Sequence, residues 1–123
     1  MLDQALIKEL TTIGVNHTPE DIVAIARLPD NKIVFLEKGK TRDGLVHIIS
    51  RHGSQFADHG ISIEQIPDVV MAAVTRGVPV GIQGRDRIIY SVEFEGAIHN
   101  VAVSIGRNGY IVSANPKSKT PRG

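Results

Sequence analysis

The chain has 123 residues, of which 41% are hydrophobic and 22% charged, and it contains no cysteine. This length matches one folded domain, and the lack of cysteine excludes disulfides, thiol nucleophiles and Cys-ligated zinc. The net charge is +1, so no overall field attracts nucleic acid or an anionic membrane. Aromatic residues are only 4% of the chain, too few for a surface that stacks successive bases.

The charge is unevenly distributed along the chain. Residues 1–75 hold 7 basic and 10 acidic side chains, whereas residues 76–123 hold 7 basic and 3 acidic ones. The carboxyl-terminal half is therefore the part suited to a polyanion, although a solvated surface with scattered basic residues explains the same counts. No apolar run reaches the roughly 18–20 residues of a membrane helix, and the amino terminus does not look like a signal sequence.

The first third of the chain is expected to be mostly helical. Residues 2–13 carry apolar side chains at helical spacing, which predicts an amphipathic helix. A Thr-Pro pair followed by two carboxylates is typical of a helix start, so residues 22–28 are predicted to form a second helix. Residues 32–37 then predict a strand and residues 38–43 a polar loop.

Helical spacing returns in residues 44–58. The apolar stripe of this predicted helix consists of Leu45, Ile48, Ile49, His52 and Phe56. Ser62 and Gln65 then form a capping box, which predicts a further helix that ends at Gly77.

After Pro79 the hydrophobic period changes to two. Residues 87–95, 97–106 and 109–115 alternate and are separated by tight-turn sequences, which predicts a three-stranded antiparallel sheet. One face of this sheet is apolar and should pack against helices, while the other is mixed and should be wetter.

Together these elements predict a single α+β domain in which amino-terminal helices pack on a twisted antiparallel β-sheet. Residues 1–31 are expected to form a helical lead-in and residues 32–115 the core of the domain. Residues 116–123 are polar and have no core pattern, which predicts a loose tail.

Three of the five histidines, His47, His52 and His59, lie close together in the chain, and imidazole titrates near neutral pH. His47 and His52 are about 140° apart around an ideal helix, so they lack the spacing of a zinc-binding pair. No metal or cofactor site is therefore predicted. His52 falls on the apolar stripe, where a hydrogen-bonded and partly buried histidine is a simpler interpretation than a catalytic one.

His47 and Arg51, four residues apart on the opposite side of this helix, form a more informative pair. An imidazole beside a guanidinium suits phosphodiester chemistry, because one moves a proton while the other holds phosphate oxygens. Helix pairing or simple solvation explains the same two residues equally well. The other candidates are the phosphate contacts Arg85, Arg87 and Lys117 and the hydrogen-bonding residues Ser113 and Asn115, each of which could also serve only solubility.

The string GLVHIISRHGSQFADHG at residues 44–60 and the ending NGYIVSANP at residues 108–116 carry a family resemblance. They resemble carboxyl-terminal toxin domains of contact-dependent growth inhibition proteins. The likeness is to the subset in the superfamily that joins barnase, EndoU, colicin tRNA nucleases and RelE, and it covers roughly residues 33–116.

The resemblance implies a metal-independent endoribonuclease that commonly attacks tRNA. In that chemistry the ribose 2′-hydroxyl attacks the adjacent phosphorus, which leaves a cyclic phosphate and a 5′-hydroxyl. Carried onto this chain, His47 and His52 become acid–base candidates and Arg51 the phosphate stabiliser, and only one of the two histidines is expected to face the substrate. Ser113 or Asn115 would support them from a strand.

The resemblance also implies partners and a location. Such a domain is exported as part of a larger cell-surface protein, acts in the cytoplasm of the target bacterium and is neutralised by a cognate immunity protein in the producing cell. The domain itself is expected to carry no membrane anchor. Two other interpretations stay open: a non-enzymatic module that binds protein through residues 44–58 and a sheet edge, and an enzyme acting on a nucleotide-type substrate.

Overall fold

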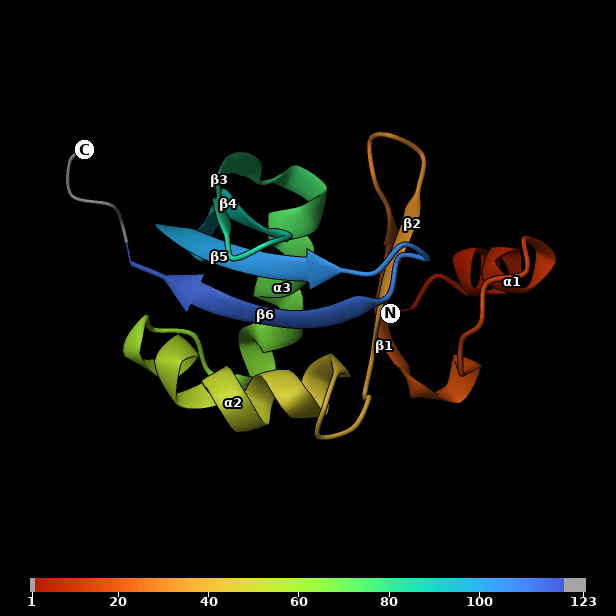
Figure 1. Ribbon diagram of the computed structural model, residues 1–123, viewed down its shortest axis with the longest axis horizontal. Helices are drawn as coiled ribbons and strands as arrows, with labels where there is room; N and C mark the ends of the chain where they lie inside the picture. The colour runs from red at the N-terminus through yellow and green to blue at the C-terminus, as the bar shows by residue number, and fades with distance from the viewer. Residues whose placement is uncertain (1, 119–123) are drawn as a thin grey trace.

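The computed structural model describes residues 2–118, and within them it is an α+β structure, as predicted (Figure 1). Its elements are α1 (Gln4–Thr12), β1 (Ile22–Arg27), β2 (Ile33–Glu37), α2 (Gly44–Asp58), α3 (Ile66–Arg76), β3 (Val78–Gln83), β4 (Arg87–Phe94), β5 (Ala97–Ile105) and β6 (Ile111–Lys117). β1 and β2 form a two-stranded sheet, and β3 to β6 form a four-stranded sheet in chain order, with every neighbouring pair antiparallel.

The predicted three-stranded sheet is present as β4, β5 and β6, and β3 adds a fourth strand at its edge. Pro79 and Gly81 weaken the strand pattern of β3, and the pairing with β4 shifts register between them. An edge strand tolerates both features, because one side of its backbone needs no partner strand. β6 continues through Lys117, two residues beyond its predicted end, whereas residues 119–123 of the predicted tail lie outside the described residues.

The predicted helix at residues 22–28 is wrong, because residues Ile22–Arg27 form β1. The Thr-Pro signal opens only a single 3₁₀ turn, Pro19–Asp21. Two isoleucines and a valine follow it, and these β-branched residues favour an extended backbone. Antiparallel pairing with β2 then decides the conformation of the segment.

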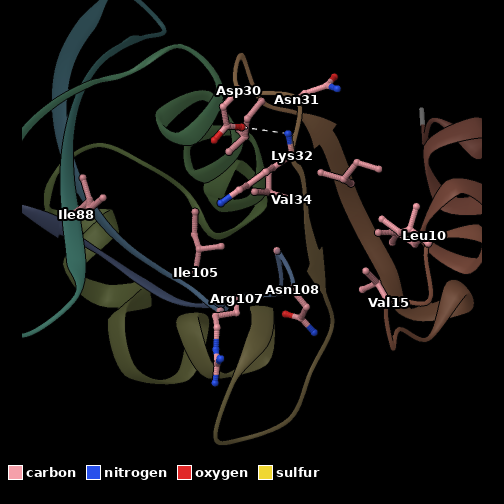
Figure 2. A pocket seen from close by; sticks show the side chains of 15 residues that line it. Leu10, Val15, Asp30, Asn31, Lys32, Val34, Ile88, Ile105, Arg107 and Asn108 are labelled. Carbon is pink, nitrogen blue, oxygen red and sulfur yellow. Dashed lines mark hydrogen bonds between the residues drawn. The ribbon is translucent and has the colours of Figure 1, made fainter.

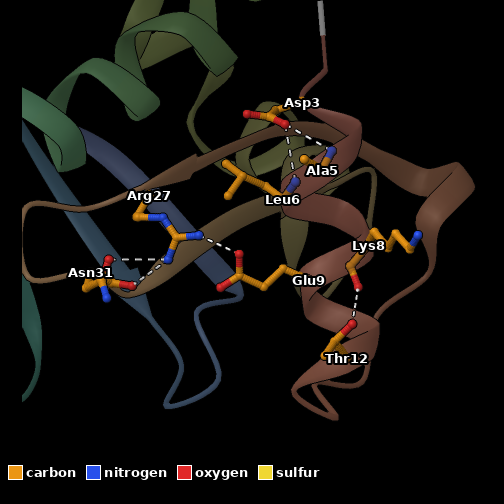
Figure 3. A network of polar contacts seen from close by, with 8 residues as sticks. All are labelled: Asp3, Ala5, Leu6, Lys8, Glu9, Thr12, Arg27 and Asn31. Carbon is orange, nitrogen blue, oxygen red and sulfur yellow. Dashed lines mark hydrogen bonds and ion pairs between the residues drawn. The ribbon is translucent and has the colours of Figure 1, made fainter.

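α1 packs on the two-stranded sheet and not on the large one, at the right of Figure 1. Its Ile7 and Leu10 are buried with residues of β1 and β2. Asp3 caps its first turn by accepting hydrogen bonds from two backbone amides, and Glu9 pairs with Arg27 of β1, as Figure 3 shows. The amino-terminal region is thus one helix and a hairpin attached beside the main sheet.

The main core lies between the large sheet and the two longer helices. α3 packs against β4, β5 and β1, and α2 runs along β6 at the other edge of the sheet (Figure 1). The buried cluster includes Ile48 and Phe56 of α2, Val69 and Val70 of α3, and Val101 of β5. α2 has the bounds that its periodicity predicts, and it packs along β6.

Candidate functional site

One face of the large sheet carries four of the eight polar side chains that the sequence singles out. Cross-strand partners project from the same face of a sheet, so the register places three rows of side chains together. We call this surface the polar face, and its rows are Ser104–Ser113, Ile89–Ala102–Asn115 and Ser91–Asn100–Lys117. Arg87 projects from the same face, because it precedes Ile89 by two residues on β4.

Arg87 is held on the polar face by Asn115. Its Nη1 donates a 2.7 Å hydrogen bond to Asn115 Oδ1 across β5. Gln83 of β3 donates to the same oxygen at 3.2 Å and accepts from Asn115 Nδ2 at 3.1 Å. Asn115 is only 7% exposed and its amide is fully occupied, so it positions Arg87 and leaves contact with a ligand to the guanidinium.

Ser113 differs from Asn115 in that its hydroxyl has no partner. The side chain is 1% exposed, and within residues 2–118 its Oγ makes no hydrogen bond. A buried hydroxyl without a partner is costly and is uncommon in folded proteins. Ser113 and Arg87 project from the same face of the sheet, although the Ser113 hydroxyl itself is covered.

The two histidines of α2 lie next to each other. The ring centroids of His47 and His52 are 6.2 Å apart, with the rings edge to face. The rings are thus neighbours although the two positions lie on different sides of the helix, and which of them faces a substrate stays a prediction. The 140° angle describes the directions of the Cα–Cβ bonds, and rotation about the side-chain torsions brings the rings together.

Both imidazoles are anchored through the same ring atom. His47 Nδ1 lies 2.9 Å from the backbone oxygen of Thr41, in the loop before α2. His52 Nδ1 lies 2.7 Å from Oε1 of Gln55, one helical turn further on. No hydrogen bond of either Nε2 atom is found within the described chain, so both rings keep a nitrogen for a ligand.

His52 is partly buried and hydrogen-bonded to Gln55, which matches the interpretation drawn from its place on the apolar stripe. Burial lowers the pKa of His52 from its ordinary value of 6.5, the Gln55 hydrogen bond raises it, and the charges of Arg87, His47 and Arg51 lower it further. Arg87 therefore lies close enough to α2 for its charge to act on His52.

The structure thus links five of the eight predicted site residues through contacts or charge, and it places Ser113 and Lys117 on the polar face beside them. Arg51 is exposed on α2 close enough to act on His52, and Lys117 ends the third row of the polar face. Arg85 is the exception, because it is exposed in the β3–β4 turn beyond the rows. The assembled group, called the histidine–arginine site below, comprises His47, Arg51, His52, Arg87, Ser113, Asn115 and Lys117.

Three residues that contact members of this site are not predicted from the sequence: Thr41, Gln55 and Gln83. Gln55 follows His52 by three residues, so helical spacing could have identified it. Gln83 lies at the end of β3, a strand that the hydrophobic pattern of the sequence does not predict. Thr41 acts through its backbone oxygen, for which side-chain identity gives no signal.

The start of α2 is fixed by close packing around Gly44. Gly44 has φ +79°, and a Cβ there would lie 3.0 Å from the Tyr110 hydroxyl. That hydroxyl donates a 2.6 Å hydrogen bond to Asp43 Oδ1. Burial, followed by the bond to Asp43, raises the pKa of Tyr110 above its ordinary value, so the phenol stays protonated as a donor.

A cavity of about 670 Å³ lies elsewhere, between α1, the β1–β2 turn and the β5–β6 turn. Figure 2 shows apolar residues such as Leu10, Val15 and Ile105 lining it, with Asp30 and Arg107 among its polar residues. None of the predicted site residues lines this cavity. It is therefore separate from the histidine–arginine site.

Across the part of the chain that the structure describes, no group of three or more His, Asp or Glu side chains is placed to hold a metal ion. None of the helices in residues 2–118 is long and apolar enough to span a bilayer. No protein-family model matches the chain, and no curated protein matches it significantly.

Proposed function

We propose that this protein is a metal-independent endoribonuclease that cleaves tRNA to a 2′,3′-cyclic phosphate and a 5′-hydroxyl. The observation that carries the proposal is the paired imidazoles of His47 and His52, with ring centroids 6.2 Å apart and both Nε2 atoms free. Two positioned imidazoles supply the base and the acid that this transesterification needs. Neither proton transfer requires a metal ion.

The cations of the site support the same reaction. Arg87 is held by Asn115 and acts electrostatically on His52, and Arg51 lies on the same helix as both histidines. Guanidinium groups bind phosphate oxygens with paired donors and stabilise the charge that develops on a pentacoordinate phosphorus. Lys117 extends the positive charge along the polar face, in the direction that a nucleic-acid backbone could follow.

The biological setting rests on the sequence resemblance of residues 44–60 and 108–116. On that basis we propose a toxin domain, delivered into a competing bacterium as part of a larger exported protein. A cognate immunity protein would protect the producing cell. The basic carboxyl-terminal half favours an immunity protein with an acidic contact surface.

Cleavage of a tRNA pool by the purified chain in excess EDTA tests the proposal. The wild-type protein should cleave, whereas His47→Ala and His52→Ala should each lower the rate by about 10²-fold or more, the usual contribution of an acid or base. His59→Ala is the matched control, because His59 caps the end of α2 and is not part of the histidine–arginine site.

The same variants separate the alternatives. Growth arrest without RNA cleavage would favour an enzyme acting on a nucleotide-type substrate. A folded protein that neither arrests growth nor cleaves RNA would favour a protein-interaction module. Activity that EDTA abolishes and a divalent ion restores would contradict the metal-independent mechanism.

A further inference from the structure

The hydrogen bonds at Nδ1 determine where each imidazole carries its proton. The Thr41 oxygen is a backbone carbonyl, which can only accept, so His47 Nδ1 must donate to it. Gln55 presents Oε1, also an acceptor, to His52 Nδ1. A neutral imidazole with a proton on Nδ1 has a lone pair on Nε2, and this is the atom that both rings keep free.

The surroundings of the two rings differ. Arg87 of β4 and His47 and Arg51 of α2 all oppose the protonated form of His52, and so does burial. Gln55, also on α2, favours the protonated form through its hydrogen bond. The net effect lowers the pKa of His52 from 6.5, so this ring is neutral at pH 7.

Building on the proposed ribonuclease function, we infer that His52 is the general base, that His47 is the general acid, and that Gln55 is a positioning residue that holds His52 as the Nδ1–H tautomer. The division rests on the 2.7 Å contact that holds His52 Nδ1 to Gln55 and on the positive charges of Arg87 and Arg51, which act on His52. The Thr41 carbonyl would give His47 the equivalent orientation, with a proton on Nε2 when the ring is charged.

The proton balance of the reaction closes with these roles. His52 Nε2 removes the proton of the ribose 2′-hydroxyl as the 2′-oxygen forms its bond to phosphorus. The bond between phosphorus and the 5′-oxygen breaks, and His47 Nε2 gives its proton to that leaving oxygen. His52 ends protonated and His47 neutral, and exchange with water restores both.

Two substitutions of Gln55 test the inference in opposite directions. Gln55→Ala removes the hydrogen bond that raises the pKa of His52, so the acidic limb of the kcat/KM profile should move to lower pH. Gln55→Glu places a carboxylate beside the ring, so the limb should move to higher pH. kcat should fall by about 10-fold in Gln55→Ala, part of the roughly 10²–10⁴-fold that a general base supplies.

Ser54→Glu is the charge-matched control. It adds the same carboxylate one residue earlier on α2, at an exposed position that helix geometry turns away from His52. Its acidic limb should stay at the wild-type pH. If Gln55→Ala and Gln55→Glu still cleave RNA but show the acidic limb of kcat/KM at the same pH, the inference is overturned. The proposed ribonuclease function would not be affected by that result.

The tautomer of His52 can be measured directly by NMR, without an RNA-cleavage assay. Long-range ¹H–¹⁵N NMR spectra of the full chain above the pKa of His52 should show the proton on Nδ1, and Gln55→Ala should lose this preference. A proton on Nε2 in the wild type would overturn the positioning role of Gln55. Correct tautomers in a folded protein that does not cleave RNA would instead contradict the proposed function, and with it the two catalytic roles.

Discussion

The hydroxyl of Tyr110 donates a 2.6 Å hydrogen bond to Oδ1 of Asp43, joining the residue before β6 to the residue before α2. These two residues are 67 positions apart in the chain. The bond lies at the end of the loop that supplies the Thr41 oxygen to His47. It therefore links the sheet that carries Arg87 to the helix that carries the histidines.

Tyr110→Phe should lower the free energy of unfolding by about 1–3 kcal/mol, the usual cost of losing a hydrogen bond to a charged acceptor. The phenyl ring retains the edge contact that Tyr110 makes with Phe35. Urea unfolding measures the change. Because the bond fixes the start of α2, RNA cleavage should fall even at temperatures where the variant is fully folded. Unchanged cleavage would show that this bond does not contribute to the arrangement of the site.

Arg87→Ala should weaken tRNA binding and flatten its salt dependence. Each phosphate contact contributes a slope of about 0.7 for a single strand, so the slope should fall by about that amount. Filter binding over a range of salt concentrations measures it, in a His52→Ala background that keeps the RNA intact. Arg85→Ala is the matched control, since Arg85 lies in the β3–β4 turn outside the rows of the polar face, and an equal loss in both variants would contradict the placement of the site.

Ser113→Ala should not destabilise the protein, although it removes a polar group from a buried position. The wild-type hydroxyl is buried without a partner, so its removal should leave the free energy of unfolding unchanged or raise it by up to about 1 kcal/mol. Thermal melts of the wild type and the variant measure the change, and a variant that melts at a clearly lower temperature would contradict the expectation.

His52 should make the stability of the protein depend on pH. Its pKa is lower in the folded state than the ordinary value of 6.5, so the unfolded chain binds more protons between the two pKa values. The contribution of His52 to stability is complete above pH 6.5 and declines as the pH falls through that interval. Urea unfolding of the wild type and His52→Ala should show a weaker pH dependence in the variant, and parallel curves would contradict the lowered pKa.

Local patterns predicted the elements whose conformation depends on local sequence. α2 has its predicted bounds because its apolar period repeats over four turns, and β4 and β5 alternate clearly. β1 was mistaken for a helix because its conformation is decided by pairing with β2, which a cap signal cannot report. β3 was missed because Pro79 interrupts its pattern at an edge position.

The candidate site was predicted as residues but not as an arrangement. His47, Arg51 and His52 share one helix, so spacing and resemblance could identify them. Their angular separation does not predict that the two rings lie next to each other, because rotation about the side-chain torsions sets the ring positions. The bond between Arg87 and Asn115 depends on the register of three strands, which periodicity alone does not determine.

The chemical groups at the new RNA ends test directly whether the ribose 2′-hydroxyl attacks the adjacent phosphorus. tRNA treated with the purified protein in excess EDTA would be digested and its new termini identified by mass spectrometry, alongside the same reaction with His52→Ala. The proposed transesterification predicts 2′,3′-cyclic phosphate and 5′-hydroxyl ends with the wild type, and intact tRNA with the variant. New ends bearing a 5′-phosphate and a 3′-hydroxyl would contradict it, because a mechanism in which the ribose 2′-oxygen displaces the 5′-oxygen cannot produce them.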